Sequence, residues 1–177
     1  MPVSSPIPNR MYPRESFVPA GRALHLIDIE NLMGGPQAGW DAIPLATEGY
    51  LATVSMTPDD LVVVATNPHL WLPAKLAWPG ALVLSGHGRD GADKVLISQV
   101  SDVDRVARRI DRLVIGSGDG IFESIAREYT VAGIPVEVLS RQDALSDLLR
   151  AEVTSVTVLP DQYVLGTQPL RDSTRAC

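Results

Sequence analysis

Three aspartates occupy positions at which a carboxylate indicates chemistry. Asp28 ends an apolar run, Asp93 lies in the first turn of an expected helix, and Asp119 follows an apolar run within a Gly-Ser-Gly-Asp-Gly segment. Carboxylates that converge on one edge of a sheet repel one another unless a cation lies between them, and oxygen-only ligands suit Mg²⁺ or Mn²⁺. The three residues therefore predict a divalent metal site of the kind that hydrolyses phosphodiesters.

A purely structural role would also explain two of these residues. Aspartate is a favoured helix N-cap worth about 1 kcal/mol, which would account for Asp119. Asp93 would complement the dipole of the helix it starts. Asp28 is harder to explain in this way, because a buried carboxylate must be paired, hydrogen-bonded or metal-bound.

The elements that must position these residues alternate between strands and helices. Residues 61–65 are continuously apolar, which is typical of a strand that helices cover on both faces. Further strands are expected in the run ending near Asp28 and over residues 81–84, 113–115, 135–139 and 156–159, and helices over 43–54, 70–78, 92–100, 103–110, 121–131 and 144–151. The alternation predicts an α/β protein, a three-layer α/β/α fold with a central, mostly parallel sheet of about five to six strands.

Ligands of such sheets bind beyond the carboxyl ends of the strands, where the strand order reverses. This rule selects the loops at residues 28–31, 85–93 and 116–120. Each of the three loops carries an aspartate, so we expect the aspartates to lie at one edge of the sheet.

The composition favours one domain with polar ends. With 177 residues and 45% hydrophobic side chains, the chain suffices for one core, which we expect over residues 21–160. The proline-rich residues 1–20 predict a flexible arm with no membrane span, and residues 161–177 a polar tail. The lone Cys177 excludes an internal disulfide framework and fits a reducing cytoplasm.

Three segments resemble the signature segments of NYN domains, which belong to the PIN-like nuclease group. They are Leu-Ile-Asp-Ile-Glu-Asn-Leu at residues 26–32, Gly-Ala-Asp-Lys-Val-Leu at 91–96 and Ile-Gly-Ser-Gly-Asp-Gly-Ile-Phe at 115–122. The similarity extends from about residue 23 to residue 159, and the segments have the order found in that family.

The resemblance implies a Mg²⁺- or Mn²⁺-dependent ribonuclease with a PIN-like fold. Asp28, Asp93 and Asp119 match the metal-binding, catalytic carboxylates, and Asn31 and Ser117 match positions that hold the substrate phosphate or support the ligands. The implied partner is RNA, single-stranded or structured.

One position departs from the family pattern. Ile121 stands where the family usually has a second aspartate, two residues after the first. Asp90, Glu123 or Asp143 could substitute for it, but each also has a simpler role, as a turn, helix-surface or helix-start residue. Loss of the carboxylate would weaken one metal site or leave a one-metal or an inactive domain.

Basic residues offer two candidate phosphate contacts. Arg89 and Lys94 flank the second aspartate and would lie beside the metal site, so they are the better candidates. A second set of arginines has helical spacing, but the aspartates that lie between them favour a solvated face of paired charges. The residues are Arg105, Arg108, Arg109 and Arg112, with Asp102, Asp104 and Asp111. His25, inside the first strand, is expected to be a hydrogen-bonded core residue.

The tryptophans have two interpretations. Trp40, Trp71 and Trp78 could stack on unpaired bases. Because aromatic residues make up only 5% of the chain, we expect at least two of the three to pack in the core or at an interface between copies of a homodimer.

The leading hypothesis is a metal-dependent ribonuclease. The alternative, motivated by Ile121 and the net charge of −6, is a catalytically degenerate PIN-like domain that binds RNA or a protein partner without cleavage. A phosphatase of similar topology is a weaker third hypothesis, because Asp28-Ile29-Glu30 lacks the second aspartate of the Asp-x-Asp pair that such enzymes use.

Overall fold

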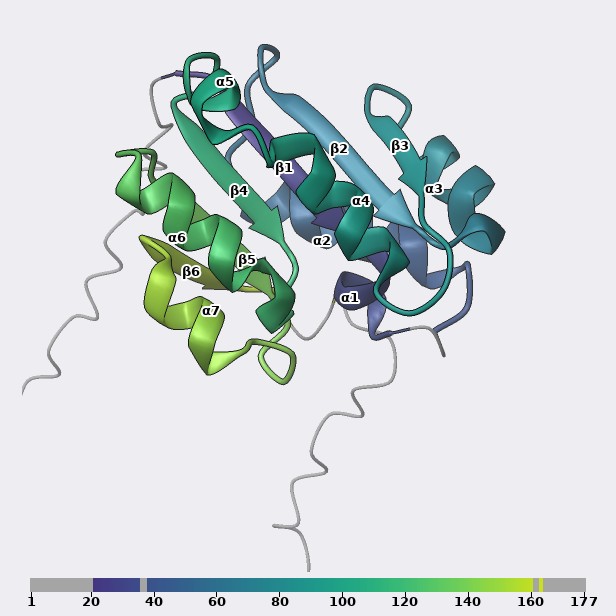
Figure 1. Cartoon of the computed structure of the whole chain (residues 1–177). Helices are drawn as coiled ribbons and strands as arrows, with labels where there is room; N and C mark the ends of the chain where they lie inside the picture. Colours follow the sequence, from purple (N-terminus) through teal and green to yellow (C-terminus); the bar gives the residue numbers. More distant parts are fainter. Residues whose placement is uncertain (1–20, 36–37, 161–162, 164–177) are drawn as a thin grey trace, which may run out of the picture.

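The computed structural model describes residues 21–35, 38–160 and 163 (Figure 1). The strands are β1 (Ala23–Asp28), β2 (Leu61–Thr66), β3 (Leu82–Ser85), β4 (Arg112–Gly116), β5 (Val136–Ser140) and β6 (Ser155–Val158). The helices are α1 (Ile29–Met33), α2 (Ala42–Thr53), η1 (Pro68–Leu70), α3 (Trp71–Ala77), α4 (Gly91–Val100), α5 (Val103–Ala107), η2 (Gly120–Phe122), α6 (Glu123–Val131) and α7 (Asp147–Glu152).

The strands form a single six-stranded sheet in the order β3-β2-β1-β4-β5-β6, and every pairing is parallel. Leu26 of β1 is in register with Val63 of β2 on one side and with Ile115 of β4 on the other. The chain builds outward from β1 to β3 and then returns to place β4 beside β1. The strand order therefore reverses between β1 and β4, which is where a ligand site is expected.

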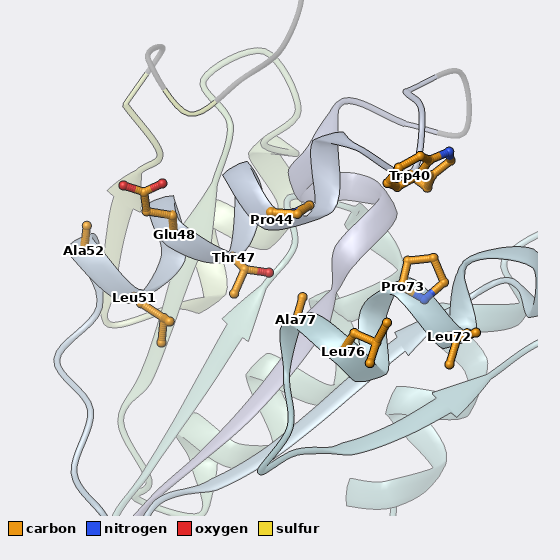
Figure 2. Close-up of a pocket in the computed structure, with 10 residues that line it drawn as sticks. All are labelled: Trp40, Pro44, Thr47, Glu48, Leu51, Ala52, Leu72, Pro73, Leu76 and Ala77. Carbon is orange, nitrogen blue, oxygen red and sulfur yellow. The ribbon is translucent and has the colours of Figure 1, made fainter.

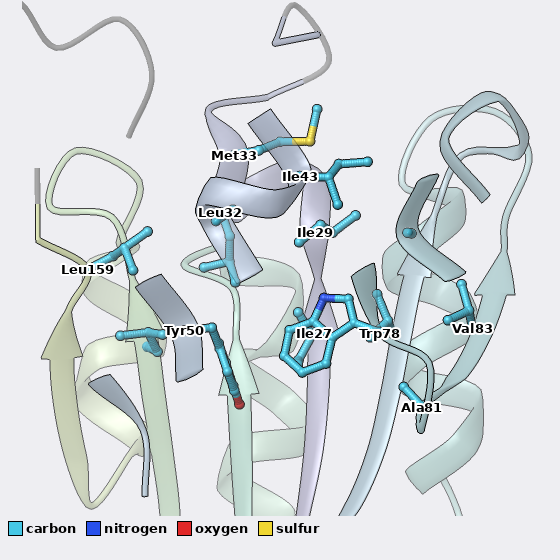
Figure 3. Close-up of a cluster of buried hydrophobic side chains, with 14 of the residues drawn as sticks. Ile27, Ile29, Leu32, Met33, Ile43, Tyr50, Trp78, Ala81, Val83 and Leu159 are labelled. Carbon is cyan, nitrogen blue, oxygen red and sulfur yellow. The ribbon is translucent and has the colours of Figure 1, made fainter. Parts of the chain in front are cut away.

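Helices cover both faces of the sheet, which confirms the three-layer α/β/α prediction. On one face α1, α2 and α3 pack over a core that contains Ile27, Tyr50 and Trp78 (Figure 3). On the other face α4 to α7 lie together, in front of the sheet in Figure 1, over a core that contains Leu26 and Phe122. Because successive side chains of β1 point to opposite faces, Leu26 and Ile27 serve different cores.

His25 is buried inside the first core and hydrogen-bonded, as expected. Its Nδ1 lies 2.8 Å from the Tyr50 hydroxyl and its Nε2 lies 3.3 Å from Asp60 Oδ2. Burial lowers the pKa of His25. Burial opposes ionisation of Asp60, but hydrogen bonds from Ala23 N, Thr57 and His25 outweigh it and hold the pKa of Asp60 below its ordinary value.

Arg112 is the cation of this buried network. Its Nη2 donates to the Ser55 carbonyl oxygen at 2.6 Å and lies 3.6 Å from Asp60 Oδ2, while its Nη1 lies 3.3 Å from Glu137 Oε2. Arg112 therefore belongs to β4 and to the interior of the protein. For Arg112, both the expected solvated, paired face and the alternative basic stripe are therefore wrong.

Two predicted helix boundaries are also wrong. The helix expected over 103–110 ends at Ala107, because Arg109 N turns back to the Val106 carbonyl at 2.8 Å and lets Ile110 enter the core. The helix expected from residue 144 begins at Asp147 instead, because Ser146 N donates to the Gly118 carbonyl at 2.8 Å. This tertiary bond holds residues 141–146 in turns against the loop that follows β4.

The described helices include none that is long and apolar enough to cross a membrane. The arm expected over residues 1–20 lies outside the described residues, as does the tail expected over 161–177 apart from Tyr163.

We predict that the Arg112→Ala substitution lowers the free energy of unfolding by about 3–5 kcal/mol, because it leaves the buried Asp60 carboxylate without its cation. Chemical denaturation measures the loss. The matched control is Arg105→Ala, which removes an exposed ion pair with Asp102 at 3.1 Å and should cost less than about 1 kcal/mol. Equal losses in the two variants would show that the buried network does not stabilise the fold.

Candidate functional site

Asp28 closes β1 and caps the helix that follows. Its Oδ1 accepts hydrogen bonds from Glu30 N at 3.1 Å and Asn31 N at 3.3 Å, so the chain turns from strand into α1 without an intervening loop. The residue is 7% exposed. Burial raises the pKa of Asp28 well above its ordinary value, and the neighbouring Asp93 charge raises it further.

Asp93 meets Asp28 from the first turn of α4. It is also 7% exposed, and its Oδ1 is buried without a hydrogen-bond partner. Burial raises the pKa of Asp93, a side-chain hydrogen bond with Asp28 partly offsets this shift, and the charges of Asp119 and Asp90 add to it. An acceptor oxygen buried without a donor costs free energy, so the site offers a place for a cation or a proton.

Asp119, in the loop between β4 and η2, is exposed. It caps η2, because its Oδ1 accepts from Ile121 N at 2.9 Å. Its charge acts on Asp93, so it lies within electrostatic reach of the buried pair. Asp119 is thus both the expected N-cap of a helix and a neighbour of the buried aspartate pair.

The two buried aspartates line a pocket of about 110 Å³ at the carboxyl edge of the sheet. Glu30, Asn67 and Asp90 line it as well, whereas Asp119 is absent from its wall. Within the described residues, no three His, Cys, Asp or Glu side chains are arranged closely enough to hold one metal ion. Mg²⁺ is commonly bound by one or two carboxylates together with water and substrate phosphate, so a two-carboxylate pocket still fits such an ion.

Asn31 and Ser117 hold the loop that carries Asp119. Asn31 Oδ1 accepts from Gly118 N at 3.0 Å, and the buried Ser117 hydroxyl accepts from Asp119 N at 3.2 Å. A Cβ at Gly118 would overlap the Ser140 hydroxyl and the Ala144 carbonyl, which explains the glycine here. Both predicted residues therefore support the site from within the protein.

Glu30 is a site residue that the sequence reasoning did not select. Its Oε1 accepts from Asn67 N at 2.5 Å, and its Oε2 accepts from Asn67 Nδ2 at 3.0 Å. These bonds tie α1 to the end of β2 and fix one wall of the pocket. In the sequence, only its position two residues after Asp28 indicates that Glu30 lies near the site.

Arg141 is a second residue that was missed. It directly follows β5, and its Nη1 donates to the Asn31 carbonyl at 3.4 Å while its Nη2 donates to Asp143 at 2.5 Å. Its side chain is mostly buried. Asp143 thus neutralises Arg141 and does not line the aspartate pocket. Only the position of Arg141 at a strand end pointed to it.

Arg89 and Lys94 lie at the start of α4 with largely exposed side chains, each 3.7 Å from an oxygen of Asp90. Asp90 adopts a left-handed backbone conformation with φ of 55° just before the helix. Both cations are therefore placed near the pocket and near solvent, where a polyanion could reach them.

Ile121 packs against the second core, beneath the loop of Asp119. Glu123 forms an ion pair with Arg127 at 2.9 Å, one helical turn away, which fits its surface interpretation. Neither Glu123 nor Asp143 is part of the pocket wall.

The tryptophans lie away from the pocket. Trp78 is buried in the first core, where its ring meets Tyr50 edge-on at 5.6 Å. The Trp71 indole N–H donates to the Val83 carbonyl at 3.0 Å, and Trp40 is exposed. None of the three lines the pocket that contains Asp28 and Asp93.

Comparisons with known proteins bear on the fold alone. No family model matches the chain, and a search of curated proteins finds no match. Among solved structures, the chain is similar to a protein of unknown function from Vibrio parahaemolyticus, with a TM-score of 0.56 and 18% identity over 80% of this chain and 94% of that one. This similarity supports the α/β architecture.

We predict that Asp28→Asn stabilises the metal-free protein at neutral pH. The raised pKa of Asp28 means that the folded state binds a proton that the unfolded state has released. The contribution of Asp28 to stability is therefore present below its ordinary pKa of about 3.9, and it falls by about 1.4 kcal/mol per pH unit until the pH passes the raised value. Asparagine keeps the cap but does not titrate.

Thermal unfolding in a chelator at several pH values measures this effect. The stability advantage of Asp28→Asn over wild type should grow from acid to neutral pH. Asp104→Asn, at an exposed position on α5, is the control and should show no such trend. If the difference in stability between Asp28→Asn and wild type did not change with pH, the raised pKa of Asp28 would be contradicted.

Proposed function

We propose that the protein is a metal-dependent ribonuclease of the NYN, PIN-like type that hydrolyses RNA phosphodiester bonds. The observation that best supports this proposal is the buried pair of Asp28 and Asp93, whose raised pKa values mark two carboxylates that lack a cation partner. The unpartnered Asp93 Oδ1 is an oxygen ligand of the kind that Mg²⁺ or Mn²⁺ prefers.

Each residue has a distinct role in the proposed reaction. A bound Mg²⁺ or Mn²⁺ would supply Lewis acidity and a more acidic water. Asp28 and Asp93 would hold it directly. Asp119, exposed at the rim, would orient a water molecule or bind the ion through one, and Asn31 and Ser117 would keep the rim loop in place.

The substrate would approach from the exposed side of α4. Arg89 and Lys94 lie there, and they would attract phosphates locally in spite of the net charge of −6. The Asp90 carboxylate now shared by these two cations would be exchanged for a phosphate. RNA, single-stranded or structured, is the substrate class we propose, and the cytoplasm is the proposed location.

A second candidate function is binding of RNA or a protein without cleavage. The observation that favours it is the apolar Ile121, which packs against the second core at the position where the family usually has an acid. The pocket then has only two buried carboxylates with which to bind an ion.

We predict that purified protein cleaves RNA in Mg²⁺ or Mn²⁺ and that Asp28→Asn and Asp93→Asn each reduce the rate by about a hundredfold or more, because each removes one of the proposed cation ligands. Asp119→Asn should also reduce the rate. Time courses on single-stranded and structured RNA provide the measurement, with Asp104→Asn as a control that retains activity. Metal-dependent cleavage that survives both Asp28→Asn and Asp119→Asn would refute the assignment.

Metal binding separates the two candidate functions. We expect isothermal titration to detect Mn²⁺ binding that is absent in Asp93→Asn and retained in Asp143→Asn, since Asp143 faces Arg141 rather than the pocket. Proton release on binding should accompany it, because the ion displaces the proton favoured by the raised pKa values. RNA binding without Mn²⁺ binding would support the non-cleaving alternative.

A further inference from the structure

An apolar groove runs between α2 and α3, on the face of the sheet opposite α4. Its volume is about 840 Å³. Side chains of α2, Leu51 among them, face side chains of α3 across it, and Trp40 stands at one end (Figure 2). The groove shares no residue with the pocket of Asp28 and Asp93.

The walls of this groove are unusual for a surface in contact with water. Trp40 is 68% exposed, Leu51 52%, Leu72 59% and Leu76 74%. Among the residues that the structure describes, Glu48 is the only ionisable one that lines it. A contiguous apolar patch of this kind is usually an interaction site and seldom remains exposed to water.

We propose that the groove is the interface with a second copy of this chain. If a fully exposed large side chain offers on the order of 200 Å², these four residues present roughly 500 Å² of apolar surface. A stable dimer buries about 800 Å² on each partner. The exposed apolar side chains of the groove alone thus supply more than half of the area that a dimer requires.

The shape of the region favours a copy of itself as the occupant. Leu72 and Leu76 of α3 form the most exposed apolar part of one wall of the groove (Figure 2). A two-fold axis along this region would place this wall of each copy against the groove of the other, so that one surface satisfies both.

The charge distribution points the same way. Two chains with a net charge of −6 repel each other, and a face that carries little charge adds least to this repulsion. The groove is such a face. None of the residues that line the groove lines the aspartate pocket, so this interface would not use the residues of the pocket.

Sedimentation or light scattering on the full chain, at increasing concentration, tests the proposal. We expect a mass equal to two 19.0-kDa chains. Leu76→Glu and Leu72→Glu should each weaken association by about a hundredfold or more, because a two-fold interface would bury two like charges without partners. Leu76→Met should preserve the dimer.

Val131→Glu is the matched control, since Val131 is 83% exposed on α6 and lies outside the groove. Circular dichroism would show that each variant is folded. A monomer at every concentration would overturn the proposal. So would a dimer that Leu72→Glu and Leu76→Glu leave intact, or one that Val131→Glu dissociates.

Discussion

The burial of two carboxylates side by side is the constraint on which this site depends. Asp28 compensates part of the cost through two backbone N–H groups of α1, but Asp93 Oδ1 has no donor. When both are ionised, the pair is not held together by its own interactions, because two negative charges in a dry environment repel. The surrounding fold must force them into place, and the free energy of that arrangement is released when a proton or cation arrives.

The fold does this with links on both sides of β1. Glu30 joins the start of α1 to Asn67 at the end of β2, and Asn31 joins it to Gly118 beyond β4. The central strand is thus braced against both neighbours at the point where the strand order reverses. The other end of the sheet is fixed separately, by the ion pairs of Arg112, so the two ends of β1 are anchored independently.

Local patterns predicted most of this architecture, and tertiary bonds account for what they missed. The apolar run at 61–65 became β2, and the strand-end rule located Asp28 and Asp119, because both depend on residues close in sequence. The start of α7 could not be predicted, since it depends on a bond from Ser146 to Gly118. The roles of Glu30 and Arg141 were missed for the same reason, because their partners lie far away in the chain.

The position of Ile121 bears on how many ions such a site could hold. Its side chain is partly buried against the second core, and it does not line the pocket. One carboxylate oxygen of Asp119 accepts the capping hydrogen bond from Ile121 N, and Asp119 does not line the pocket. The pocket between Asp28 and Asp93 therefore suits one directly bound ion, and a second ion would have to depend on Asp119 and the substrate phosphate. A chain built in this way would couple full occupancy of the site to the presence of substrate.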